Sequence, residues 1–446
     1  MKKSELSRTL KLAWPIVIGQ LSHIALGVID SVMVGDLGAD QLAAVSVSVG
    51  LFSILMVFGI GVSFAISPLT AIANGEGDHY KAEAILKNSF YMALALGSAL
   101  ALLMILLAPV LHLLNQPEAV TELSIPYLRI LGLSMLPVMI YQAFRQFSEG
   151  LEIMYPALVI GLLMIPINAF GNWLLIFGNW GFPAMGLEGA GWATTITRLL
   201  AAAAMMTYVL NNKRFKVYEP LKLGLNTLQK TVMTRILKLG IPGGVQYIFE
   251  TSAFAFAAIM IGWLGSKPLA AHQIAINLAS ISFMVAIGLS SASAIRIGHA
   301  QGKNDFVLAR KIGKDSFWLS GGFMGLCGLV FILGRFYFPS LYISDPEVIN
   351  LAAQLLLIAA AFQIVDGIQA VGVGLLRGME DVKRPTLYVM IAYWVIALPL
   401  GGLLAFQLNF GVMGVWVALA LGLMASAIML SYRFFRLVGQ KIRERA

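Results

Sequence analysis

The sequence is poor in charged residues. Only 12% of its 446 residues are charged and 59% are hydrophobic, whereas soluble domains carry about 25% charged and about 45–50% apolar residues. The mean hydropathy is +0.83. This composition predicts an all-α integral membrane protein. Because membrane spans would use most of the chain, no room remains for a large soluble domain, and most enzymes with a folded catalytic domain are excluded.

Cysteine is almost absent, and so are the short motifs of common catalytic and cofactor sites. The only cysteine, Cys327, lies in an apolar run and cannot form an internal disulfide or a cysteine metal cluster. The chain has no Walker or Rossmann glycine pattern, no HExxH and no CxxC. ATP hydrolysis, redox chemistry and zinc binding therefore have no motif, and we expect neither an enzyme nor a cofactor.

Long apolar stretches are abundant, and Gly, Pro, Asn or charged clusters separate them. A helix needs about 20 apolar residues to cross the hydrocarbon core of a bilayer. The stretches that meet this requirement are 10–34, 42–72, 84–110, 121–144, 156–178, 188–210, 235–263, 269–298, 312–336, 348–376, 384–406 and 412–436. The sequence therefore predicts twelve transmembrane helices.

Lysine and arginine are distributed unequally between the two sides that these spans define. An even number of spans puts both termini on one side, and nearly all basic residues lie there, including those in 213–222, 310–314 and 433–445. The other side holds little beyond Lys267 and Arg335. The positive-inside rule then places both termini in the cytoplasm. Topology thus explains the net charge of +9, and no nucleic acid is expected as a partner.

The chain divides near its midpoint into two similar halves. The only long polar connection, 211–230, predicts an N-terminal six-helix bundle at 1–210, a cytoplasmic linker at 211–234 and a C-terminal six-helix bundle at 235–446. The halves align at an offset of 227 residues, the separation of Lys11 and Lys238. The matched pairs include Pro15 and Pro242, Gly35 and Gly262, Leu42-Ala43-Ala44 and Leu269-Ala270-Ala271, Asp78 and Asp305, and Ser89-Phe90 and Ser316-Phe317.

This repeat predicts a parallel arrangement of the two bundles. Each half contains an even number of spans, so both enter the membrane in the same direction and are related by an axis along the membrane normal. Two equivalent bundles that face each other are typical of transporters. A duplicated bundle that serves only as a stable scaffold is the alternative.

Three carboxylates lie well inside predicted spans: Asp30, Glu250 and Asp366. Such an acid costs about 2.5–3.5 kcal/mol on insertion scales and usually faces a cavity, an ion path or a partner. At the offset of 227, the counterparts of Asp30 and Glu250 are Ala257 and His23, and that of Asp366 lies near Met139. Because the other copy of the fold manages without each acid, a functional role is favoured over that of a buried, hydrogen-bonded structural acid.

In the C-terminal half, the neighbours of the acids suit a cation. Gln246 and Tyr247 precede Glu250 by four and three residues, and Gln363 precedes Asp366 by three, so each shares a helix face with an acid. Na+ is a hard cation that favours oxygen ligands, as Mg2+ and Ca2+ do. Two adjacent carboxylates repel each other unless a cation or proton lies between them. The pattern predicts a Na+ or H+ site at Glu250 and Asp366, with Gln246, Tyr247 and Gln363 as candidate supporting ligands.

In the N-terminal half, Asp30 stands alone as an intramembrane acid. Asn168 and Asn172 lie one helical turn apart on the fifth span, and Thr194 lies on the sixth. These side chains suit hydrogen bonding to the carboxylate or sharing an ion with it. The alternative is that they only join helices through hydrogen bonds worth under about 1–2 kcal/mol each. Arg198 lies deep in the sixth span, and the sequence does not identify its partner.

Over essentially its whole length the sequence resembles the multidrug and toxic compound extrusion (MATE) family, and within it the NorM-like branch. The motifs that carry the resemblance are Ile29-Asp30-Ser31-Val32-Met33-Val34-Gly35, Leu42-Ala43-Ala44, Phe249-Glu250, Leu269-Ala270-Ala271-His272-Gln273-Ile274, Val365-Asp366 and Leu376-Arg377-Gly378. One position departs from the pattern, because some NorM-like members have a tyrosine where this chain has Phe362.

The resemblance implies a monomeric transporter made of two six-helix bundles, in which Na+ or H+ moves inward while a cationic or amphipathic drug moves outward. It implies Asp30 as the cation or proton acid of the first bundle, surrounded by Asn168, Asn172 and Thr194. It implies Glu250 and Asp366 as a Na+ site of the second bundle. Small-molecule drugs and membrane lipid are then the expected partners.

Together these observations favour secondary active multidrug efflux by alternating access, driven by Na+ or H+ antiport without ATP. The alternative within transport is a flippase for lipid-linked oligosaccharides of the same superfamily. Such flippases generally favour a cavity lined by several basic residues, whereas Arg198 is the only deep basic residue in this sequence. A channel or a membrane-bound transferase are alternatives from other classes.

Overall fold

The computed structural model describes residues 5–114, 116–218 and 228–445. Within them the protein is helical and has no strand, and twelve helical stretches are long and apolar enough to cross a membrane. These stretches coincide with the twelve predicted spans, which confirms the all-α membrane fold. Most helices extend beyond the predicted ends; the last one, for example, continues to Arg443. Hydropathy marks only the part of a helix that lies in hydrocarbon, while the helix itself continues into the polar region.

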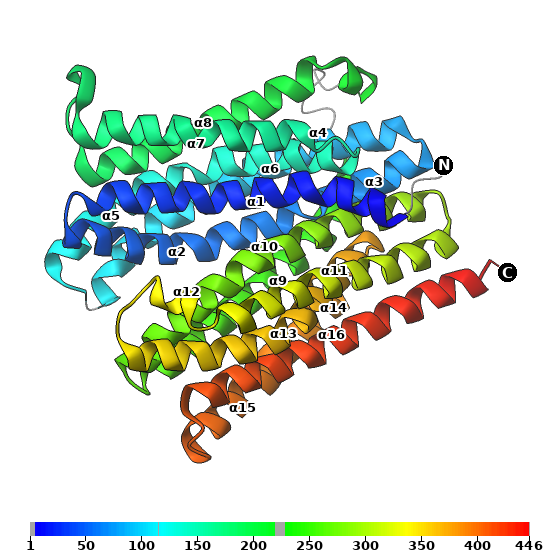
Figure 1. Ribbon diagram of the computed structural model, residues 1–446. Helices are drawn as coiled ribbons and strands as arrows, with labels where there is room; N and C mark the ends of the chain where they lie inside the picture. The colour runs from blue at the N-terminus through cyan, green and yellow to red at the C-terminus, as the bar shows by residue number, and fades with distance from the viewer. Residues whose placement is uncertain (1–4, 115, 219–227, 446) are drawn as a thin grey trace. The chain divides into compact units, whose positions relative to one another are not determined.

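The first six spans are formed by helices that lie before the midpoint of the chain (Figure 1). Two of these spans are each built from two consecutive helices, α2 with α3 and α5 with α6. The elements are α1 (Glu5–Gly35), α2 (Ala39–Ser63), α3 (Ile66–Glu76), α4 (His79–Leu107), η1 (Ala108–Leu114), α5 (Glu118–Leu133), α6 (Met135–Gly150), α7 (Tyr155–Phe177), η2 (Asn179–Gly181), α8 (Gly186–Asn211) and η3 (Lys213–Tyr218).

The last six spans follow in the second half of the chain. The elements are α9 (Lys230–Gly262), α10 (Ser266–Gly302), α11 (Phe306–Gly334), α12 (Tyr337–Ser340), α13 (Pro346–Gly378), α14 (Lys383–Met390), η5 (Ile391–Ala397), α15 (Leu398–Gly402), η6 (Leu403–Gln407) and α16 (Gly411–Arg443). In the eleventh span, η5 and η6 are π-helices that flank Pro399. Proline has no N–H and crowds the preceding turn; the irregular turns beside it accommodate this defect, and such π segments are frequent near functional sites.

The chain forms two compact units. The N-terminal bundle comprises Ile18–Gly244, and the C-terminal bundle comprises Met1–Val17 together with Val245–Ala446. The unit boundaries therefore differ from the predicted division at 211–234. Residues 5–17 of α1 belong to the C-terminal bundle, and residues 230–244 of α9 belong to the N-terminal bundle. The two break points, after Val17 and after Gly244, are themselves 227 residues apart, so the exchange obeys the sequence repeat.

Glycines allow the two exchanged segments to pack closely. In the N-terminal bundle, a Cβ on Gly240 or Gly244 of α9 would lie 2.7 Å from a carbonyl oxygen of α2. In the C-terminal bundle, a Cβ on Gly288 of α10 would lie 2.4 Å from Cγ2 of Val17. A side chain at any of these positions would push the helices apart, so backbone contact explains why each half-helix belongs to its unit.

The repeat seen in the sequence is also present in the backbone. Asp78 caps α4 by accepting a hydrogen bond from Lys81 N at 3.0 Å, and Asp305 caps α11 by accepting one from Leu308 N at 2.8 Å. Gly38 and Gly265, which precede α2 and α10, have φ of 124° and 119°. Because only glycine adopts such angles readily, the matched glycines have the same conformational role in both copies.

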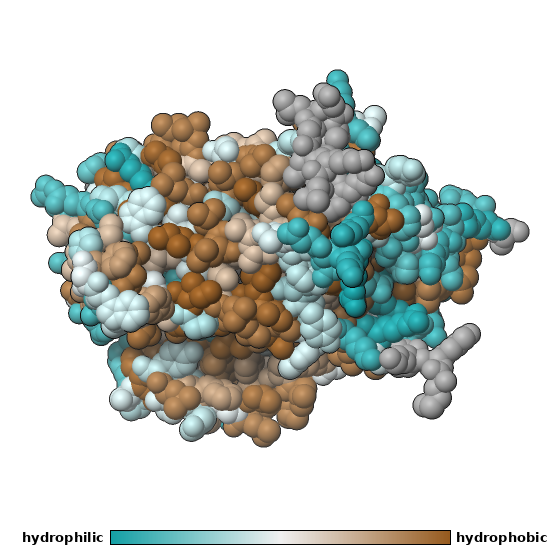
Figure 2. All heavy atoms as spheres, turned by 90° about the horizontal axis from the view of Figure 1, so that it is seen from above, coloured by the Kyte–Doolittle hydropathy of each residue, from teal (hydrophilic) through white to brown (hydrophobic). Residues whose placement is uncertain are grey.

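The surface of the spans is apolar. Large hydrophobic side chains are exposed along them, including Leu106, Leu199, Leu333 and Ile428. Figure 2 shows a broad band of hydrophobic side chains over the helices, with hydrophilic side chains gathered towards the helix ends. This distribution is that of a protein whose helices face lipid.

Candidate cation-binding sites

In the N-terminal bundle, Asp30 on α1 meets polar side chains of α7 and α8. Asn172 Nδ2 donates a hydrogen bond to Asp30 Oδ1 at 2.7 Å, and Thr194 Oγ1 donates one to Asp30 Oδ2 at 2.9 Å. Asn168 contacts this pair, with its Nδ2 at 3.5 Å from Thr194 Oγ1 and its Oδ1 at 3.4 Å from Asn172 Nδ2. The structure thus brings together all four polar residues that the sequence analysis placed at this site.

The surroundings of Asp30 are buried and rich in oxygen atoms. Asn168, Asn172 and Thr194 are all buried. Both amide hydrogens of Asn172 face acceptors, and its Oδ1 has no hydrogen-bond partner among the described residues. An unused carbonyl oxygen beside a carboxylate is suited to a hard cation or to a protonated acid. The side chain of His23 lies outside the described part of the structure.

Arg198, whose partner the sequence did not reveal, lies on α8 four residues after Thr194. Its Nη1 donates a hydrogen bond to Ser134 Oγ at 2.5 Å, between α5 and α6. Its guanidinium also lies over the ring of Phe52, 4.9 Å from the centroid. The arginine acts electrostatically on Asp30 without forming an ion pair with it within the described residues. Asp30 is therefore held mainly by neutral donors.

In the C-terminal bundle, two acids and two further polar side chains form a second cluster. Glu250 lies on α9, Asp366 and Gln369 lie on α13, and Tyr393 lies on η5. Gln369 Nε2 donates to Glu250 Oε1 at 3.4 Å, and the Tyr393 hydroxyl lies 3.5 Å from the same oxygen. The two carboxylates interact electrostatically. Within the described residues, Asp366 accepts no hydrogen bond.

The candidate supporting ligands of this site lie around it in different ways. Gln363 is buried on α13, and its Nε2 donates to Ser282 Oγ of α10 at 2.8 Å. Tyr247 faces Arg377, whose guanidinium is 5.9 Å from the ring centroid. Gln246 is buried. Among the described residues, the amide oxygens of Gln246 and Gln363 have no hydrogen-bond partner, so they remain free to accept a cation.

Sequence reasoning did not identify Gln369 and Tyr393, which are the side chains that contact Glu250. A signal existed for Gln369, which follows Asp366 by three residues and shares its helix face. No signal in the sequence joined the eleventh span to Glu250. Phe362, at the position where some relatives of the NorM-like type have tyrosine, packs against Trp416 with ring centroids 5.5 Å apart. In this chain Tyr393 brings a hydroxyl to the acid cluster from another helix.

Comparison with known proteins gives a consistent result. The MatE family model matches residues 15–174 and 242–403. A probable multidrug resistance protein NorM of Brucella suis biovar 1 is 34% identical over 442 residues, covering 97% of this chain and 93% of the relative. The multidrug resistance protein NorM of Photobacterium profundum is 35% identical over 436 residues, covering 97% of this chain and 95% of the relative.

Solved structures share the fold. The eukaryotic MATE transporter AtDTX14 has a TM-score of 0.88 at 20% identity and covers 99% of this chain and 98% of its own. An outward-facing multidrug resistance MATE family transporter of the MOP superfamily has a TM-score of 0.89 at 18% identity, covering 98% of this chain and 97% of its own. At these identities the likeness concerns the fold alone.

Proposed function

The chain belongs to the MatE family of membrane transporters, and we propose that it exports cationic and amphipathic compounds in exchange for Na+ or H+. Its relatives with the name NorM are multidrug resistance proteins. The observation that carries the proposal is the presence of acids inside membrane-spanning helices of both bundles, Asp30 in one and Glu250 with Asp366 in the other. Intramembrane acids of this kind mark ion and proton pathways.

The Glu250 and Asp366 cluster supports coupling to a cation. Two negative charges that interact in a buried site are unfavourable together. A Na+ ion or a proton relieves their repulsion. The hydroxyl oxygen of Tyr393 lies beside Glu250, where it can bind the same cation, and the amide nitrogen of Gln369 donates to the carboxylate. Cation binding there, or at Asp30, destabilises the drug-bound state and so exchanges one solute for the other. No tightly bound cofactor is required.

The energy for export comes from the cation gradient. A monovalent cation that moves down the membrane potential releases about 2.3 kcal/mol per 100 mV, before any concentration term. Rocking of the two bundles opens the drug-binding site to one side of the membrane and then to the other. This alternating access converts the energy into drug efflux. The protein acts as a monomer in the bacterial inner membrane, with both termini in the cytoplasm, as the distribution of lysine and arginine supports.

The proposal is tested by efflux of a fluorescent lipophilic cation from proteoliposomes. One arm imposes a Na+ gradient at equal pH, and the other imposes a pH gradient without Na+. We expect Na+-driven efflux, which would support Glu250 and Asp366 as the coupling site; drive by protons alone would move the coupling to Asp30. For substitutions of the intramembrane acids in this assay, the matched control is Glu118→Gln, which neutralises an exposed acid at the start of α5. Absence of efflux under both gradients would overturn the proposal and favour the lipid-linked oligosaccharide flippase.

A further inference from the structure

Gln369 and Tyr393 form a closed set of hydrogen bonds on one oxygen of Glu250. The Tyr393 hydroxyl donates to Gln369 Oε1 at 3.0 Å and lies 3.5 Å from Glu250 Oε1. Gln369 Nε2 donates to that same carboxylate oxygen at 3.4 Å. Both side chains are buried. The amide is held at both ends, so its orientation relative to the carboxylate is fixed.

A tyrosine hydroxyl has one proton, and here two acceptors compete for it. The shorter distance favours Gln369 in this arrangement, and the longer one leaves the contact with Glu250 weak. When Glu250 is ionised and no cation is bound, the hydroxyl proton is drawn to the carboxylate. When Glu250 holds a cation, the proton turns to Gln369 and the hydroxyl oxygen becomes available to the cation.

The π-helix η5 joins this pair to α9. Trp394, the residue after Tyr393, donates a hydrogen bond from Nε1 to the carbonyl oxygen of Phe249 at 3.1 Å. Phe249 is the residue before Glu250. Two successive residues of η5 thus contact two successive residues of α9, so the position of the hydroxyl is tied to the backbone that carries the acid.

We propose that Gln369 and Tyr393 are positioning residues that set the cation affinity of Glu250. This inference rests on the proposed cation antiport. Removing the hydroxyl takes away an oxygen that can bind the cation and leaves the carboxylates in place, so Tyr393→Phe should bind the cation more weakly and need a higher Na+ concentration for half-maximal efflux. The expected loss of affinity is about tenfold, because the contact between the hydroxyl oxygen and the bound cation is lost and a polar contact with a charged group is worth about 1.5 kcal/mol or more.

The test measures cation binding and transport separately on purified full-length protein. Binding is followed by Na+-dependent thermal stabilisation at fixed pH and by pH titration without Na+. Transport is followed by the Na+ concentration that gives half-maximal efflux. Tyr141→Phe is the matched control, because its buried hydroxyl contacts the carbonyl oxygen of Ala157 at 3.4 Å rather than an acid.

The outcomes separate this proposal from the proposed function. A higher half-saturating Na+ concentration in Tyr393→Phe, with no change in Tyr141→Phe, supports the positioning role. Gln369→Asn should also raise the half-saturating Na+ concentration. Unchanged binding in Tyr393→Phe, or an equal shift in Tyr141→Phe, overturns it. A wild-type protein that binds Na+ without exporting drug would refute antiport and leave the positioning role intact. Absence of both Na+- and pH-dependent stabilisation would overturn both.

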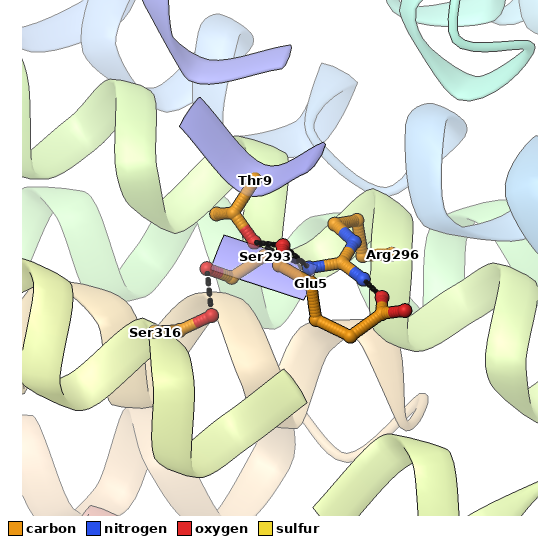
Figure 3. A network of polar contacts seen from close by, with 5 residues as sticks. All are labelled: Glu5, Thr9, Ser293, Arg296 and Ser316. Carbon is orange, nitrogen blue, oxygen red and sulfur yellow. Dashed lines mark hydrogen bonds and ion pairs between the residues drawn. The ribbon is translucent and has the colours of Figure 1, made fainter. Parts of the chain in front are cut away.

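A second network, at the start of α1, carries an independent inference. Arg296 of α10 forms an ion pair with the Glu5 carboxylate, donates to the Glu5 carbonyl oxygen at 2.7 Å and donates to Thr9 Oγ1. Figure 3 shows the guanidinium between these groups, with the Ser293 to Ser316 hydrogen bond of 2.9 Å beside it. One buried arginine therefore binds both the side chains and the backbone of the first turn of α1.

The repeat shows that the fold does not need these charges. At the offset of 227, the counterpart of Arg296 is Leu69, and the counterparts of Glu5 and Thr9 are Val232 and Ile236. Leu69 and Ile236 are buried apolar residues. Both copies of the fold therefore contain this part of the helix, and the C-terminal bundle has an ion pair and hydrogen bonds at positions where the N-terminal bundle has apolar residues.

We propose that residues 5–17 form a releasable strap, held on α10 by Arg296, and that its release accompanies opening of the transporter to the cytoplasm. The remainder of α1 belongs to the N-terminal bundle and carries Asp30. The Glu5 carboxylate is partly exposed, so water can reach the ion pair and replace its contacts on release, whereas separating apolar surfaces in water costs about 25 cal/mol per Å². The polar attachment of the first turn is thus better suited to repeated opening than the apolar residues at the corresponding positions of the N-terminal bundle. This inference rests on the proposed cytoplasmic position of the N-terminus.

The test measures the reactivity of a cysteine under the strap. In a Cys327→Ser background, Ala13→Cys places a thiol at a buried position of α1, next to Gly288 of α10. We expect Arg296→Gln to raise its rate of reaction with a maleimide about tenfold, as loss of a charge-assisted contact predicts. The charge-exchanged protein Glu5→Arg with Arg296→Glu should restore slow reaction. Arg310→Gln removes an exposed arginine of α11 and is the matched control.

Two results would overturn the strap: an unchanged rate in Arg296→Gln, or an equal increase in Arg310→Gln. Thr9→Val removes the hydrogen bond from Arg296 and the one to the Glu5 carbonyl oxygen but keeps the ion pair. It should give a smaller increase, so it replaces Arg296→Gln if that variant does not fold. Because the readout is chemical reactivity, it does not depend on drug transport. Fast reaction of the Ala13→Cys thiol while Arg296 is intact would refute a closed strap, whether or not the protein exports drug.

Discussion

The two acid sites occupy corresponding bundles of one repeated fold, yet they hold their charges differently. Asp30 is a single carboxylate with both oxygens in hydrogen bonds of 2.7 and 2.9 Å. Among the residues that the structure describes, Glu250 has hydrogen-bond contacts of 3.4 and 3.5 Å on one oxygen alone, and a second carboxylate, Asp366, interacts with it. Fixed dipoles of the protein stabilise the first charge, whereas the second pair needs a mobile cation or proton. We therefore expect substitutions in the C-terminal site to affect coupling most.

The largest effect is expected for Asp366→Asn. The amide removes one of the two charges that bind the cation, so cation-driven efflux should fall about 100-fold, as expected when a contact with a charged group is lost. Expression and thermal stability should be unchanged, because the substitution also removes repulsion from Glu250. Efflux of a fluorescent cation in proteoliposomes measures this, with Glu118→Gln as control. Normal Na+-dependent efflux by Asp366→Asn would eliminate the C-terminal site.

A smaller and different effect is expected for Asp30→Asn. The neutral amide can still pair with Asn172 and Thr194, so the protein should fold. Efflux should fall about tenfold, while Na+-dependent stabilisation, which reports on the C-terminal site, should stay at the wild-type value. The two variants assayed side by side separate the sites. If Asp30→Asn abolished Na+ binding as well, the two sites would not be independent and the contrast between them would fail.

Asn172→Ala tests whether the donors around Asp30 do hold its charge. The variant loses the 2.7 Å hydrogen bond and leaves the carboxylate under-bonded. We expect a loss of about 1 kcal/mol in unfolding free energy, within the range for hydrogen bonds between membrane helices. Asn168→Ala removes longer contacts with Thr194 and Asn172, at 3.5 and 3.4 Å, and should lose less. Thermal unfolding in detergent compares the two variants. Equal losses of unfolding free energy would mean that the direct hydrogen bond from Asn172 to Asp30 stabilises the protein no more than the contacts of Asn168 do.

The contrast also marks the limit of what the sequence could predict. Twelve spans, the repeat and the three acids follow from hydropathy, register and the rarity of charge in hydrocarbon. Asn168, Asn172 and Thr194 were found near Asp30 because their polarity stands out in apolar spans. Tyr393 was not found, because its place beside Glu250 depends on how the eleventh span packs and on the π-helix near Pro399. The exchange of residues 5–17 and 230–244 was likewise hidden, since apolar helices of similar composition give no sign of which bundle they join.

The smallest effect is expected at the acids that both copies retain, Asp78 and Asp305. Each caps a helix, and replacement by alanine should cost about 1 kcal/mol of unfolding free energy with no change in cation-driven efflux. The hydrogen bond from Lys81 N lowers the pKa of Asp78 from its ordinary 3.8. Its stabilisation is therefore full above pH 3.8 and is lost as pH falls through the lowered value.

The thermal midpoints of Asp78→Ala and the wild type should accordingly converge in strong acid and differ at neutral pH. Loss of coupling in Asp305→Ala would contradict a purely structural role for an acid present in both copies. The opposite reasoning applies to Asp30, Glu250 and Asp366, which each occur in one copy only. A charge that the fold requires recurs at the repeat offset, and a charge that transport requires has no reason to recur.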